Sequence, residues 1–159
     1  MASRNEEPTR GNPRSTAKIA DHPIHPMLIP FPIVCFVGTF VTDLVYSRNA
    51  DPGWASASHW LLGFGLLTAA LAAAAGLTDY LGDDRIRRLG DALKHMLANV
   101  AAVVLEAVNL ALRIDNDDFI GSTGIYISGV VVLLLLYSGW KGGDLVYRHG
   151  IGVHDRSNL

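Results

Sequence analysis

The sequence predicts an all-α membrane protein, an up-down-up-down bundle of four transmembrane helices with the N and C termini cytoplasmic. Half of the 159 residues are hydrophobic and only 18% are charged, against about 25% charged in soluble domains. Residues 26–42, 54–78 and 119–140 contain no Asp, Glu, Lys or Arg. These stretches of 17, 25 and 22 residues are close to or above the ~20 helical residues that cross a hydrocarbon core. A soluble bundle would instead need a charged face on every helix.

The ends of the predicted spans carry helix-start signals. The second span begins at Asp51-Pro52, an N-cap followed by proline at the first helical position. The fourth follows Asp117 and Asp118, which are also capping residues, and the third is the least apolar because Glu106 interrupts it. The spans are predicted over 27–46, 51–80, 90–113 and 119–147. The connections are so short that neighbouring helices must run antiparallel.

Lys and Arg are distributed unevenly between the two ends of this bundle. Only Arg48 and Arg113 lie at one end. The other end carries Arg4, Arg10, Arg14, Lys18, Arg85, Arg87, Arg88, Lys94, Lys141, Arg148 and Arg156. Positive residues stay on the cytoplasmic side of a membrane, so both termini are predicted there, in a bacterial inner membrane. The chain then divides into a disordered cytoplasmic tail (1–20), a transmembrane domain (21–155) and a C-terminal tail (156–159).

Five polar side chains form one stripe along the third span. At about 100° per helical residue they share a face, whereas the other faces hold Leu, Val and Ala. The stripe consists of His95, Asn99, Glu106, Asn109 and Arg113. Ionisable groups inside a span face the bundle interior, where they form a functional site or a structural pair. The alternative is a purely structural role, in which Glu106 forms an ion pair with Arg113 across two turns of the helix.

The histidines separate by membrane face. Five of the six lie at the cytoplasmic ends of helices: His22, His25, His95, His149 and His154. His59 alone lies at the outer side, where Asp43, Arg113 and Glu106 could join it in one polar cluster. His22 and His25 each precede a proline, which biases both toward extended backbone. This segment is predicted to be a stiff, nonhelical lead into the first span. It could serve as a ligand-bearing arm or simply as a device that starts the helix.

Three motifs resemble a family of small bacterial four-helix membrane proteins known only as a domain of unknown function. They are the segment HPIHPMLIPFP from His22 followed by Asp43, the pair His95 and Asn99, and the segment GWKGGDLVYRHGIGV from Gly139. The resemblance covers about 20–155. The family often has a histidine where this chain has Pro30. Its members are similar to four-helix membrane cytochromes b, and some relatives are fused to Rieske iron–sulfur domains, which implies redox work.

Two functional hypotheses follow. The first is electron transfer with a b-type haem or with quinone, because a four-helix bundle can supply two axial imidazoles from facing helices. His95 is the first candidate ligand, with His25 preferred over His149 as its partner and His22 as a further candidate. The second is a redox-inert accessory protein or a small proton or ion carrier.

Other classes of function have less support in the sequence. An ordinary enzyme is the least supported, because no nucleophile–base pair or phosphate loop is present, and His-x-x-His alone is a weak metal signal. The predicted partners are the lipid bilayer, a redox partner or quinone, and further copies of the chain. Nothing in the composition indicates nucleic acid.

Overall fold

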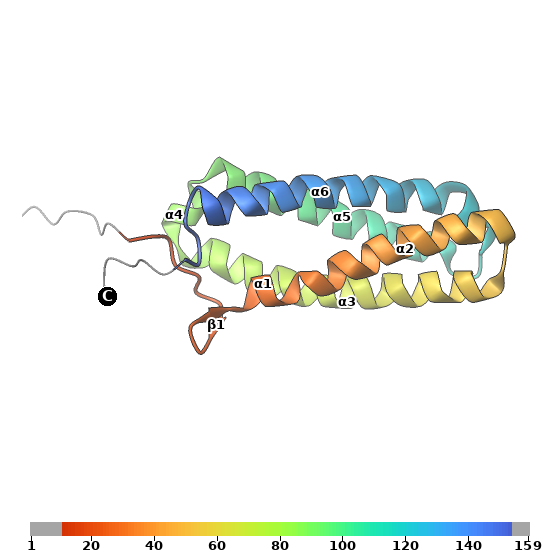
Figure 1. Cartoon of the computed structure of the whole chain (residues 1–159), viewed down its shortest axis with the longest axis horizontal. Coiled ribbons are helices and arrows are strands. Elements are labelled where there is room, and N and C mark those ends of the chain that lie inside the picture. The colour runs from red at the N-terminus through yellow and green to blue at the C-terminus, as the bar shows by residue number, and fades with distance from the viewer. Residues whose placement is uncertain (1–10, 154–159) are drawn as a thin grey trace, which may run out of the picture.

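Four long antiparallel helices form the bundle in the computed structural model, which describes residues 11–153. They are α2 (Pro30–Asn49), α3 (Pro52–Gly82), α5 (Gly90–Arg113) and α6 (Ile125–Tyr147). Figure 1 shows them side by side along the long axis of the molecule. α2 packs chiefly on α3 and α5 on α6, while α2 also contacts α6 and α3 contacts α5. The helices therefore follow one another around the bundle in chain order.

The outer surface of the bundle is apolar. Within residues 11–153, four helical segments are long and apolar enough to cross a membrane: Ile24–Asn49, Pro52–Gly82, Gly90–Arg113 and Ile120–Tyr147. Large side chains such as Phe64, Leu67 and Leu71 are more than half exposed along α3. A soluble protein would bury such a surface. The chain is therefore a multi-pass membrane protein that contacts the lipid bilayer.

The helix starts agree with the sequence at α3 and differ at the fourth span. Asp51 caps α3, because its Oδ1 accepts from the Gly53 amide at 2.7 Å. Asp117 and Asp118 make no such side-chain cap, which corrects the prediction. The span begins instead with η1 (Ile120–Gly124), one stretch of π-helix that leads directly into α6.

The segment before the first span is only partly extended. His22–Pro23 forms strand β2, which pairs antiparallel with β1 (Lys18–Ile19). His25, however, lies in the helix α1 (Ile24–Leu28), which corrects the prediction of a nonhelical arm. Pro26 falls in the first turn of α1, where its missing N–H would have had no helical partner, so the proline does not prevent the helix.

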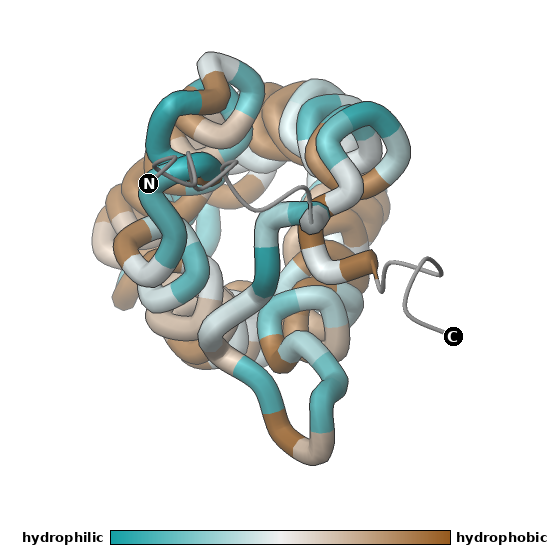
Figure 2. Tube along the Cα trace, turned by 90° about the vertical axis from the view of Figure 1, so that its left-hand side faces the viewer, coloured by the Kyte–Doolittle hydropathy of each residue, from teal (hydrophilic) through white to brown (hydrophobic). Residues whose placement is uncertain are grey.

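Residues 11–23, here called the strap, lie across the end of the bundle that also holds the short helix α4 (Asp84–Arg87) and residues 148–153. We call this the N/C end and the opposite one the far end; Figure 2 views the N/C end and shows the strap across it. Asp79 of α3 fixes the strap, since its Oδ1 accepts from the Thr16 and Ala17 amides, both at 2.7 Å. Residues 11–20 were expected to belong to a tail; residues 1–10 and the C-terminal tail from 156 lie outside the described residues.

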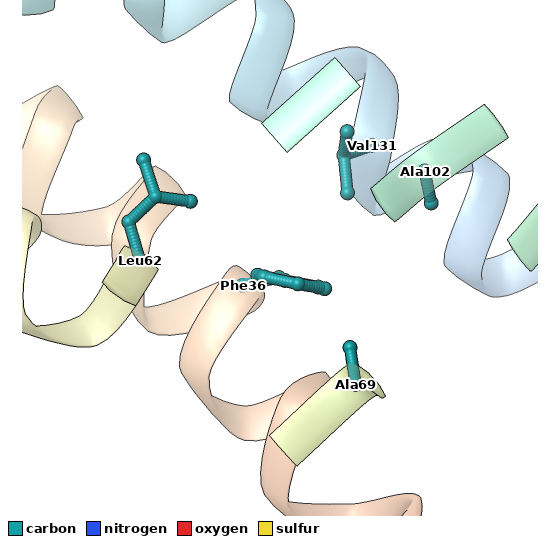
Figure 3. Close-up of a cluster of buried hydrophobic side chains, with 5 residues drawn as sticks. All are labelled: Phe36, Leu62, Ala69, Ala102 and Val131. Carbon is teal, nitrogen blue, oxygen red and sulfur yellow. The ribbon is translucent and has the colours of Figure 1, made fainter. Parts of the chain in front are cut away.

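The centre of the bundle is an apolar layer to which α2, α3, α5 and α6 all contribute. It consists of Phe36, Leu62, Ala69, Ala102 and Val131, whose side chains point into the space between the helices (Figure 3). Toward the N/C end, the other buried residues of α3 and α5 are all alanines: Ala72, Ala75, Ala92 and Ala98. The interior of this half is thus lined by small side chains.

Candidate functional site

Two histidines face each other in the half of the bundle near the N/C end. His25 comes from α1 and His95 from the second turn of α5. Their ring centroids are 6.1 Å apart, and the ring planes are nearly perpendicular, at 88°. We call these two residues the histidine pair.

Hydrogen bonds to main-chain carbonyls orient both rings of the pair. His25 Nδ1 lies 2.8 Å from the Ala72 carbonyl on α3, and His95 Nδ1 lies 2.9 Å from the Ser138 carbonyl on α6. A carbonyl only accepts, so Nδ1 carries a proton in each ring, and in the neutral imidazole the lone pair is then at Nε2. The Asn99 amide donates to His95 Nε2 at 3.1 Å, which agrees with this tautomer.

A glycine makes room for each ring. A Cβ built on Gly76 of α3 would lie 2.9 Å from His25 Nδ1, and one on Gly142 of α6 would lie 3.2 Å from His95 Cε1. Neither position accepts a side chain without moving the imidazole. Helices α1, α3, α5 and α6 thus all help to position the pair.

The remaining histidine candidates at this end lie apart from the pair. His22 is exposed, and its ring contacts the Ala20 carbonyl at 2.8 Å. His149 Nε2 lies 3.2 Å from Asp91, a carboxylate that also pairs with Lys141. His149 therefore belongs to a group of ion pairs between α5 and the end of α6.

A second polar site lies in the half of the bundle near the far end. Its members, here called the buried cluster, are Asp43, Ser58, Glu106, Asn109, Arg113 and Ser128. The Arg113 guanidinium donates to both oxygens of Asp43, at 3.0 Å each, and both side chains are 0% exposed. Arg113 also donates to Ser58 at 2.6 Å and to Asn109 Oδ1 at 2.7 Å.

Two serine hydroxyls complete the shell around the Asp43 carboxylate. Ser58 donates to Oδ1, and Ser128 donates to Oδ2 at 2.7 Å. Gly124, at the end of η1, lets the guanidinium approach this helix, because a Cβ there would lie 3.1 Å from Arg113 Nη2. Charge-assisted bonds of this kind are the strong ones in a low-dielectric interior.

The partner of Arg113 is Asp43 and not Glu106, which corrects the pairing expected along the stripe. Arg113 is seven positions after Glu106, which corresponds to about 10 Å along the helix. Asp43 lies directly opposite on α2, so it is the nearer carboxylate. Glu106 Oε2 accepts instead from Asn109 Nδ2 at 2.8 Å. Within the part of the chain that the structure describes, Glu106 Oε1 and Arg113 Nε have no hydrogen-bond partner.

His59 borders the buried cluster without joining it through side chains. Its Nδ1 lies 2.8 Å from the Ala55 carbonyl and its Nε2 lies 3.2 Å from the Arg113 carbonyl. The ring lines an open pocket of about 590 Å³ at the far end, together with Trp60, Asp115 and Asp117. Four residues were expected to form an outer cluster. Of these, Asp43 and Arg113 bind each other directly, Glu106 is bound to Asn109, and His59 contacts the Arg113 carbonyl.

Sequence reasoning missed the two serines and the two glycines. Ser58 and Ser128 are single hydroxyls in apolar helices, and only knowledge of which faces meet identifies them as ligands of Asp43. Gly76 and Gly142 resemble the many small residues that simply pack membrane helices. Only their distances to the imidazoles separate them from the rest.

The apolar layer separates the two sites. Ala102 lies between Asn99 and Glu106 on the stripe and packs with Phe36 and Val131. Among residues 11–153, no three side chains of the His, Cys, Asp and Glu type come together in a way that could hold a metal ion. The histidine pair therefore offers two nitrogen ligands, and the buried cluster offers one ion pair with an additional carboxyl.

A family model described as "Predicted membrane protein (DUF2231)" matches residues 21–155. Comparisons with curated proteins and with solved structures give no match.

Proposed function

We propose that this chain, which belongs to the DUF2231 family of predicted membrane proteins, binds a b-type haem between His25 and His95 and transfers electrons. The observation that carries the proposal is the close approach of the two imidazoles, whose ring centroids lie 6.1 Å apart with the ring planes at 88°. With metal–nitrogen bonds of about 2 Å, two imidazoles that ligate one iron from opposite sides hold their ring centres roughly 6 Å apart.

The surroundings of the pair suit axial ligands. A metal-ligating histidine commonly donates its second N–H to a carbonyl, which fixes the tautomer and the ring orientation. His25 and His95 both do so through Nδ1. The buried residues of α3 and α5 in this half are alanines, so small side chains line its interior. Ligation at His95 would require the Asn99 amide to leave Nε2, while its bond to the His95 carbonyl at 2.9 Å could remain.

Haem supplies a one-electron couple when bound, and two histidine ligands suit electron transfer because they leave no open position for oxygen. The chain contributes the two imidazoles and their orientation. A quinone in the bilayer or a redox protein would be the electron donor or acceptor. We place the N/C end on the cytoplasmic side of a bacterial inner membrane because it carries most of the Lys and Arg.

A visible spectrum of the purified protein, with and without dithionite, tests the proposal after expression with ample haem. The wild type should show the strong violet band of haem, which shifts on reduction. His95→Ala and His25→Ala should each abolish or strongly alter this spectrum. The matched controls are His59→Ala at the far end and His149→Ala at the N/C end, and both should retain it.

A colourless wild-type protein would overturn the proposal. The alternative is then a redox-inert accessory protein or a small ion carrier. Its support is the buried cluster, in which nearly every polar side-chain atom has a hydrogen-bond partner, as in a purely structural network. A spectrum lost in His59→Ala and kept in His95→Ala would move the haem to the far end and would contradict the site.

A further inference from the structure

The formal charges of the buried cluster do not cancel. Three of its side chains are ionisable, namely Asp43, Glu106 and Arg113, and all three are 0% exposed. Arg113 and Asp43 form a paired cation and anion. If Glu106 were also ionised, the cluster would carry one net negative charge inside the membrane.

Among residues 11–153, Arg113 is the one cation whose charge acts on Glu106. On its own helix, Arg113 interacts with it electrostatically, and on α2 the charged group is Asp43. α6 contributes Ser128, which is uncharged, and α3 contributes Ser58. His59 of α3 contacts the cluster at the Arg113 carbonyl, and its ring lines the open pocket that Asp115 and Asp117 also line.

Glu106 itself has hydrogen-bonding capacity to spare. Its Oε2 accepts from Asn109, whereas Oε1 is buried and has no partner among the described residues. A buried carboxylate normally accepts several hydrogen bonds, and an uncompensated charge in the hydrocarbon region is very costly. A carboxyl in this position becomes neutral by taking a proton, and Oε1 is the oxygen free to carry it.

We propose that Glu106 is a proton-binding site, which holds one proton at neutral pH and so makes the buried cluster electrically neutral. A hydronium ion supplies the proton: its O–H bond breaks to leave water as the O–H bond to Oε1 forms, and the formal charge of the cluster changes from −1 to 0. The site does not depend on haem, because the apolar layer lies between it and the histidine pair.

A simple count follows for variants. The number of protons held should equal the number of carboxyls in the cluster minus the number of cations. The wild type should hold one. Asp43→Asn should hold none, because Glu106 then ionises as the counter-ion of Arg113. Arg113→Gln should hold two, because both carboxyls lose their cation.

Infrared spectroscopy of the purified full-length chain in detergent tests this count at pH 7. A protonated carboxyl has a carbonyl-stretching band that a carboxylate lacks, and the exposed acids of the chain are ionised at this pH. The wild type should show the band, Glu106→Gln and Asp43→Asn should lose it, and Arg113→Gln should roughly double its area. Asp144→Asn is the matched control, because Asp144 is a buried carboxylate with two cationic partners, and the band should not change.

Absence of the acid band from the wild type would overturn the proposal, whether or not the variants fold. A band that persists in Glu106→Gln would assign the proton to another group and would also overturn it. The spectrum should be the same in sodium and in choline buffer. Loss of the band on adding sodium would mean that a cation, not a proton, neutralises Glu106. If the protein binds no haem but its infrared spectra agree with this count, the electron-transfer proposal fails and the proton-binding proposal stands.

Discussion

At the scale of single residues, the Arg113 guanidinium makes four hydrogen bonds in the interior. It donates to a carboxylate, a hydroxyl and a side-chain amide, and none of these groups is exposed. Removing one partner of a buried ion pair is costly, because the remaining charge must either stay unsolvated or be neutralised by a proton. Removing Arg113 should nevertheless cost more than removing Asp43, because Glu106 can replace Asp43 as the counter-ion.

We predict that Arg113→Gln destabilises the protein by about 3–5 kcal/mol, the range measured for broken buried pairs. Asp43→Asn should cost less, because Glu106 can ionise and take over as the counter-ion. A double-mutant cycle should give a larger coupling of Arg113 to Asp43 than to Glu106. The measurement is unfolding in detergent by titration with dodecyl sulfate. Equal couplings would argue against the observed pairing.

The glycines beside the histidine pair give a second prediction at this scale. Gly76→Ala brings a methyl group to 2.9 Å from His25 Nδ1, so the ring must move. Such overpacking typically costs about 1–3 kcal/mol. It should also alter the haem spectrum, if haem is bound.

Gly63→Ala is the control for that substitution. Gly63 lies on the same helix with nothing within 4 Å of a built Cβ, so alanine there should be neutral or slightly stabilising. The readouts are thermal unfolding and the visible spectrum. Equal stability of the two variants would show that the His25 ring has room to move.

At the scale of elements, the strap depends on carboxylates of α3 and of the connection that follows it. Asp79 accepts two backbone amides and the Ser15 hydroxyl, which lies 2.9 Å away. Asp83 accepts from the Arg14 amide at 3.3 Å and from the Arg85 side chain. These contacts hold the chain across the N/C end, directly before the helix that carries His25.

We predict that Asp79→Asn loosens the strap. Hydrogen bonds to a charged acceptor contribute about 1.5–3 kcal/mol. Their weakening should speed amide exchange at Thr16 and Ala17 by roughly 10- to 100-fold. Asp84→Asn is the control, because Asp84 pairs with Arg87 at the surface. Unchanged exchange at Thr16 would mean that other contacts fix the strap.

The strap should also show a pH dependence, which arises outside the membrane-spanning segments. The Arg85 side chain lowers the pKa of Asp83 to about 2, below the ~3.9 of an unfolded chain. A lowered pKa means that the stabilisation is complete above about pH 4 and is lost as the pH falls toward 2. The amide signal of Arg14 should therefore titrate with a midpoint near 2. A midpoint near 4 would show that Asp83 is not held by Arg85.

The elements could be predicted to different degrees for physical reasons. Long apolar stretches fix the four spans because the bilayer thickness sets their length. The first and last turns depend on local chemistry. The hydrophobic pattern therefore predicted neither the helical conformation of His25 in α1 nor the π-helix that begins at Ile120. The polar stripe was predictable from its helical period, whereas the partner of Arg113 depends on which residue of another helix lies at the same depth.

At the scale of the whole molecule, the two ends of the bundle differ in charge. We predict that reporter fusions after residue 159 and within 82–89 report cytoplasm, and that fusions within 48–52 or 114–118 report periplasm. The reason is the concentration of Lys and Arg at the N/C end, where Figure 2 shows hydrophilic residues on the connections. A periplasmic C terminus would contradict this orientation.

The π-helical turn at Ile120–Gly124 has a consequence for how the far half of the bundle could change over time. A π turn holds one residue more than an α turn, and Ser128 follows one turn later. Losing a single codon from the π turn would therefore leave an α turn in its place, and the residues on either side of it would keep their faces. Losing one between Gly124 and Ser128 would instead rotate these two residues by about 100° relative to each other. They would then no longer both face Arg113 and Asp43, although every side chain of the buried cluster was still encoded. The buried cluster thus tolerates a change in length at the π turn and is dismantled by the same change one turn later, a difference that no scan of substitutions would detect.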